Sequence, residues 1–201
     1  MTAQKGRDLL LKLDTTGGGS FQTVAGLRAN ALSFNGTSSY VDLGSAPALT
    51  GTGSMTWAAW INATGTPEDD GQIIAKSDSA SGWQLKTSPD TGPHTFGLKV
   101  TYSTGSAQRY SKTVRALNTW YHVAGVYNAA TRALDIYVNG VLDNGVLQGT
   151  IPASQTLPNI NVNIGRRAGG FYFKGTIDDV RVYNRALSQS EIQAIMGTPL
   201  P

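Results

Sequence analysis

The sequence predicts an all-β chain, an antiparallel sandwich of two sheets with one short helix near the C-terminus. A length of 201 residues suits a single sandwich with a full core. The 24 glycines and a charged fraction of only 14% are typical of short strands joined by turns. No face of Glu and Lys recurs at helical spacing before the C-terminal end, so an extended helical domain is excluded.

The first half of the chain contains short apolar or alternating runs separated by turns rich in Gly, Asp and Asn. In the longest run Trp57, Ala59 and Ile61 share one face, and Trp60 lies on the other. The strands predicted here span residues 9–13, 21–25, 31–34, 40–43, 54–61, 73–75, 83–85 and 96–100.

The second half continues this pattern. Residues 103–107 predict a flexible turn, and residues 171–173 predict exposed aromatic rings after a Gly-Gly loop. Asn139-Gly140 predicts a tight hairpin turn, because both residues tolerate positive φ, with a return strand from Val141. The other strands predicted here span residues 120–127, 134–138, 161–165 and 176–183.

One helix is predicted near the C-terminus. Ser188 and Glu191 have the spacing of a capping box, and an apolar stripe follows them. Gly197 and Pro199 are expected to end this helix.

Charge and composition exclude several classes of partner. The net charge of +3 is spread thinly, with Arg166-Arg167 the only adjacent basic pair, so nucleic acid is not an expected partner. The absence of cysteine excludes disulfides and thiolate chemistry. No signal-peptide core and no apolar run long enough for a membrane span are present, so we expect a soluble chain.

Five phrases in order resemble the laminin-G-like domains of the concanavalin A-like lectin and glucanase superfamily. They span residues 31–41, 55–61, 119–124, 136–140 and 175–188. The resemblance covers about residues 30–197 and implies a two-sheet jelly roll over residues 30–201. It implies a carbohydrate-binding or adhesion domain outside the cell, with a glycan or a cell-surface receptor as partner; a protein-binding module is a further alternative.

The N-terminal segment carries a second resemblance. Residues 2–12, 21–28 and 33–35 resemble the start of the major tail tube proteins of siphovirus-type phages and gene transfer agents, and the likeness ends after Asn35. It implies an alternative, a phage tail or virion protein that displays the jelly roll and contacts other virion proteins. Residues 1–29 could equally be a strand-turn-strand segment of the sandwich, since laminin-G-like domains often begin with a Leu-Asp step and a Gly-rich turn.

We expect that the protein is not an enzyme. Glycoside hydrolases place two carboxylates roughly 5–9 Å apart across a cleft, and the Glu-x-x-x-Glu type strand signature of the hydrolases with this sandwich is missing. The two glutamates are Glu68, in a polar loop, and Glu191, at the helix cap. His122 lies on a predicted strand beside Trp120, which favours a core position over a catalytic triad.

The resemblance also implies a structural calcium ion. Calcium is bound by six to eight oxygen atoms, which turn-rich β-proteins supply readily. Asp178 matches the family's ligand position, and Asp14 and Asn35 are candidate partners on the early strands. The alternative is that Asp178 accepts hydrogen bonds from backbone amides or from Arg181.

Aromatic residues near loops are the candidate ligand contacts, because sugars present apolar C–H faces to rings and hydroxyls to polar side chains. Trp57, Trp60 and Trp120 are expected in the core. Two groups near predicted loops remain, for which ordinary loop packing is the alternative role. They are Tyr102, Arg109, Tyr110, Arg166, Phe171 and Tyr172.

Overall fold

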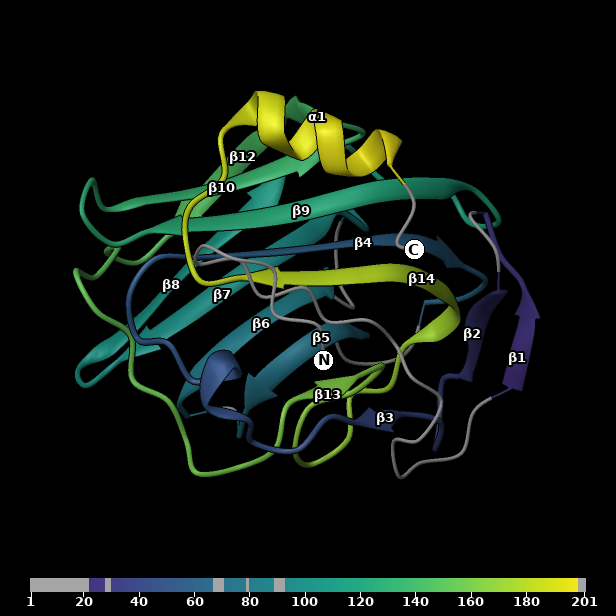
Figure 1. Ribbon diagram of the computed structural model, residues 1–201, viewed down its shortest axis with the longest axis horizontal. Helices are drawn as coiled ribbons and strands as arrows, with labels where there is room; N and C mark the ends of the chain where they lie inside the picture. The colour runs from purple at the N-terminus through teal and green to yellow at the C-terminus, as the bar shows by residue number, and fades with distance from the viewer. Residues whose placement is uncertain (1–21, 28–29, 67–70, 79, 89–92, 199–201) are drawn as a thin grey trace.

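A computed structural model describes residues 22–27, 30–66, 71–78, 80–88 and 93–198. In this part of the chain two seven-stranded antiparallel sheets pack as a sandwich (Figure 1). Sheet A contains, in spatial order, β1 (Gln22–Ala25), β2 (Asn30–Asn35), β14 (Lys174–Tyr183), β4 (Met55–Ala63), β9 (Trp120–Asn128), β10 (Ala133–Val138) and β11 (Val141–Leu142). Sheet B contains β12 (Asn144–Gln148), β8 (Gly105–Ser111), β7 (Phe96–Tyr102), β6 (Gly82–Thr87), β5 (Gln72–Ser77), β13 (Asn163–Ile164) and β3 (Val41–Asp42). The predicted all-β sandwich is confirmed.

The core lies between the inner faces of the two sheets. The predicted alternation of β4 is confirmed, because Trp57, Ala59 and Ile61 are fully buried in this core. Trp57 packs against Trp83 of β6 with ring centroids 4.9 Å apart, so the two largest core side chains join the sheets at their centre. Trp60 lies on the opposite face of β4 against His122, which is 2% exposed, as expected for a core histidine.

The helix α1 (Gln189–Gly197) covers part of the outer face of sheet A. Its Ile192 is buried with Val126 of β9 and Tyr137 of β10, and Figure 1 shows the helix near β9 and β10. The predicted capping box is confirmed: the Ser188 hydroxyl accepts from the Glu191 amide, and the Glu191 carboxylate accepts from the Ser188 amide. The last secondary element therefore begins where the sequence indicates.

Replacing Ser188 by Ala is expected to lower the free energy of unfolding by about 1 kcal/mol, because one helix N-terminal amide loses its acceptor. Urea unfolding followed by circular dichroism measures this change. The matched control is Gln189→Ala, an exposed position in the first turn of the helix, which should change the free energy by less than about 0.5 kcal/mol. Equal losses in both variants would contradict the capping role.

Three predictions on local structure are wrong. The turn predicted over residues 103–107 is shorter, because β8 begins at Gly105. The strand β12 lies in a segment where no strand was predicted. Phe173, expected to be exposed, is 1% exposed and packs edge-on against Phe34.

Some predictions lie outside the described residues. They include the strand over residues 9–13, Asp14 and the loop containing Glu68. β1, which falls within the predicted strand over residues 21–25, pairs with β2 and so belongs to sheet A. No helix in the described part of the chain is long and apolar enough to cross a membrane.

Candidate functional site

The outer face of sheet B is mostly polar. Leu85 of β6 and Leu98 of β7 point into the core, so their chain neighbours point outward. One row of paired residues crosses all seven strands on this outward side. It consists of Asp42, Asn163, Ala75, Gln84, Lys99, Gln108 and Gln148.

The predicted ligand residues of β7 and β8 point in different directions. Tyr110 lies on the polar outer face opposite Gly97, and its ring centroid is 6.0 Å from Lys86 Nζ. Arg109 pairs with Leu98 on the inner side, and its guanidinium donates to the backbone carbonyls of Leu134 and Gly145. Tyr102 is half-buried at the end of β7. Tyr110 is thus the member of this group on the polar face.

The second predicted group lies at the other side of sheet B. The Arg166 guanidinium stacks 3.3 Å above the ring centroid of Tyr40, and that of Arg167 stacks 3.3 Å above Phe171. Tyr172 is half-buried beside them. Three strands separate β13 from β8, which corresponds to roughly 19 Å at the usual strand spacing. The structure therefore does not bring the two groups into one site.

The residues predicted to hold calcium are not grouped in the described part of the chain. Asn35 Oδ1 already accepts three backbone N–H bonds, from residues 37–39. Asn35 pairs with Lys174, whereas Asp178 lies four residues further along β14, roughly 13 Å away. No cluster of three or more His, Cys, Asp or Glu able to hold a metal occurs among the described residues. Asn35 and Asp178 therefore do not fit one coordination shell, and the calcium ion stays a prediction.

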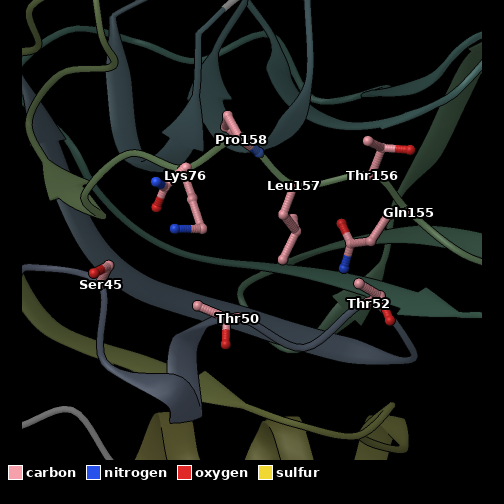
Figure 2. Close-up of a pocket in the computed structure, with 9 residues that line it drawn as sticks. Ser45, Thr50, Thr52, Lys76, Gln155, Thr156, Leu157 and Pro158 are labelled. Atoms are coloured by element: carbon pink, nitrogen blue, oxygen red, sulfur yellow. The ribbon is translucent and has the colours of Figure 1, made fainter.

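A pocket of about 510 Å³ lies between two loops and a strand of sheet B (Figure 2). Its walls come from the β3–β4 connection, which contains the short helix η1 (Pro47–Leu49), from β5, and from the β12–β13 connection. Most of its side chains are hydroxyls and amides. The lining residues are Ser45, Thr50, Thr52, Lys76, Gln155, Thr156, Leu157, Pro158 and Asn159.

Gln155 joins two walls of this pocket. Its backbone N–H donates to the Thr52 carbonyl at 3.0 Å, and its side-chain nitrogen contacts the carbonyls of Gly51 and Gly53. These two acceptors identify the nitrogen of the amide, which lies toward Thr52 in Figure 2. The remaining oxygen, Oε1, is buried and has no hydrogen-bond partner. A buried unpaired acceptor costs about 1–3 kcal/mol, so a donor brought within reach of this oxygen would be stabilised there.

Lys76 supplies the positive charge of the pocket. It lies on β5 opposite Trp83, on the inner side of sheet B, and is 2% exposed. Its ammonium group donates to the Ile160 carbonyl. Burial lowers the pKa of Lys76 below its ordinary value, because the charged form loses hydration.

Close backbone packing holds the wall that the β12–β13 connection forms. The Thr156 N–H donates to Thr101 O, and the Gly82 N–H donates to Thr156 O, both at 2.8 Å. Gly82 has φ +92°, and a Cβ added there would lie 1.7 Å from the Lys76 carbonyl oxygen. Only glycine allows this approach. The wall that carries residues 155–159 is therefore fixed against the ends of β6 and β7.

Sequence reasoning missed this pocket because its walls are far apart along the chain and none has a known motif. The one local signal is Lys76, a cation directly after the apolar run 73–75 in a strand that is buried throughout. In an edge strand or a half-exposed strand, a lysine at this position would be expected to point into solvent.

Comparison with known families identifies the fold class of the chain. The Laminin_G_3 family model, described as the concanavalin A-like lectin/glucanases superfamily, matches residues 35–193. The chain therefore belongs to this family, and the expected laminin-G-like jelly roll is confirmed. No curated protein matches the chain in sequence.

Solved structures with this fold include several binding domains. Domain 4 of AbnA, an extracellular arabinanase from Geobacillus stearothermophilus, solved with arabinotriose, has 19% identity and a TM-score of 0.68 over 89% of this chain and 82% of its own. The CBM40 domain of a Ruminococcus gnavus sialidase, bound to sialyllactose, has 16% identity and a TM-score of 0.65 over 83% and 96%. The binding domain of Paraclostridial Mosquitocidal Protein 1 has 15% identity and a TM-score of 0.68 over 94% and 47%. At these identities the likeness shows the fold alone.

Proposed function

We propose that the chain is a non-catalytic carbohydrate-binding domain that acts outside the cell, and that the pocket lined by Lys76 and Gln155 holds the glycan. The observation that carries the proposal is the buried, unpaired Gln155 Oε1 in a pocket lined by hydroxyls and amides. A sugar hydroxyl can donate to that oxygen and accept from the surrounding groups. The solved glycan complexes with the same fold support it.

The composition of the pocket argues against hydrolysis of the glycan. Glycoside hydrolysis needs two carboxyl groups flanking the bond, and none of the residues that line the pocket is Asp or Glu. Among the described residues the one glutamate, Glu191, caps α1 and pairs with Arg185 at 2.7 Å. Since the family name includes glucanases, an assay for release of reducing sugar from any bound glycan tests this part of the proposal directly.

Two lining positions test the site. Gln155→Ala and Asn159→Ala are each expected to weaken glycan binding at least tenfold, which is about 1.4 kcal/mol, because each removes a hydrogen-bonding group from the pocket. A glycan array identifies the ligand, and isothermal titration calorimetry measures the affinity. The exposed side chain of Asn159 makes no hydrogen bond within the described part of the chain, so its loss should leave the melting temperature unchanged.

The matched control is Gln148→Ala, an exposed glutamine on β12 outside the pocket. Its affinity should equal that of the unaltered protein. If both pocket variants still bind the glycan, the binding site lies elsewhere. Tyr110→Ala then tests the polar face of sheet B, and Tyr172→Ala tests the edge beside β13. Receptor and virion partners stay predictions, and residues 1–21 of the tail-like segment lie outside the described residues.

A further inference from the structure

Among the residues that the structure describes, Lys76 has no anionic partner for its charge. Between described residues, ion pairs join Arg181 to Asp179 and Arg185 to Glu191, and neither involves Lys76. The residues that line the pocket contain no carboxylate and no other titratable side chain. An ammonium group that is buried without an anion is unfavourable for folding. Structural packing alone would be served better by an apolar side chain of similar length.

The Lys76 side chain is almost fully covered, but its ammonium group uses only one of its donors among the described residues. One of its three N–H donors is directed at the Ile160 carbonyl. Figure 2 shows its side chain in the same hollow as Leu157 and across from Thr50. The pocket therefore combines one positive charge with hydroxyl and amide groups and with the apolar surfaces of Leu157 and Pro158.

We infer that the pocket takes an acidic sugar residue with a single negative charge, held by the Lys76 ammonium group, while Gln155 Oε1 accepts from a hydroxyl of the same residue. This inference rests on the proposed function and names its ligand class. A single point charge matches a single anionic group. A carboxylate, as in a uronic or sialic acid, and a sulfate ester share that charge, and the test separates them.

The experiment uses the full chain and a panel of matched glycan pairs. Each carboxylated glycan is compared with its methyl ester, and each sulfated glycan with its desulfated form, by calorimetry at low salt. We expect at least one acidic glycan to bind tenfold or more tightly than its neutral counterpart. Whether the carboxylate pairs or the sulfate pairs show the preference identifies the anion.

Lys76→Met removes the charge and keeps the length of the side chain. The variant should lose the preference, binding both members of the pair within about twofold, which is about 0.4 kcal/mol. Its melting temperature should equal or exceed that of the unaltered protein, because a desolvated charge is lost. Lys112→Met, at an exposed lysine outside the pocket, is the control and should keep the preference.

A second measurement does not depend on a variant. Binding of an anion favours the charged form of Lys76, so affinity for the acidic glycan should fall as pH rises through the lowered pKa of Lys76. Affinity for the neutral counterpart should stay constant over the same range. Equal binding of both members, or a preference that persists in Lys76→Met, would overturn the inference while leaving the proposed function intact. Failure to bind any glycan of the panel would count against both.

Discussion

Replacing Trp57 by Ala is expected to lower the free energy of unfolding by about 3–5 kcal/mol. Trp57 is fully buried and packs against Trp83, so its removal leaves a cavity between the two sheets at the centre of the core. Guanidinium unfolding followed by circular dichroism measures the change. A loss below about 1.5 kcal/mol would show that the sheets can close over the gap.

Trp57→Phe serves as the matched variant. The indole N–H of Trp57 is buried and has no hydrogen-bond partner. Phenylalanine keeps most of the ring contact with Trp83 and removes that unpaired donor, which costs about 1–3 kcal/mol in such a place. We therefore expect Trp57→Phe to lower the free energy of unfolding by less than half as much as Trp57→Ala does.

Replacing Asp179 by Asn is expected to lower the free energy of unfolding by about 3 kcal/mol. Asp179 accepts two hydrogen bonds from the Arg181 guanidinium, at 2.8 and 2.7 Å, and both residues are buried. The side-chain hydrogen bond and the charge of Asp179 raise the pKa of Arg181 against its burial. Asn at position 179 leaves that cation without its anion. Since Asp179 has φ +50°, Asn is preferred to Ala, because it tolerates this left-handed conformation.

The double variant Asp179→Asn with Arg181→Met separates the charge from the packing. Removing both members of a buried ion pair is often close to neutral, so the double variant should recover most of the lost stability. Urea unfolding of the unaltered protein, of Asp179→Asn, of Arg181→Met and of the double variant gives the coupling energy. If the double variant is as unstable as the single one, the backbone bulge of β14 rather than the ion pair is the sensitive element.

The fold was largely predictable because its strands form short apolar or alternating runs separated by turns. Trp57, Ala59 and Ile61 identify the core face of β4 without any other information, and the capping box of Ser188 places the start of α1. The strand β8 escaped prediction because its sequence GSAQRYS is mostly small and polar. Its one long inward residue, Arg109, is accommodated by two backbone carbonyls that belong to β10 and β12. No local pattern encodes such partners.

The candidate site was less predictable than the fold. Aromatic residues beside turns led to Tyr110 and to the Arg166–Phe171 region, which the structure places at opposite sides of sheet B. The pocket depends instead on Lys76 and Gln155, whose burial follows from loops that meet only in three dimensions. Sequence periodicity reports which face of a strand is covered, but it carries no information on which distant loop covers it.

The hydrogen bonds of Gln155 have a consequence for the timing of recognition. Because this side chain ties residues 51–53 to the β12–β13 connection before any sugar arrives, little loop ordering should accompany binding. The association rate constant should then be nearly the same for tightly and weakly bound glycans. Selectivity among glycans would be expressed in how long each one stays, so surface plasmon resonance should find the differences in the dissociation phase.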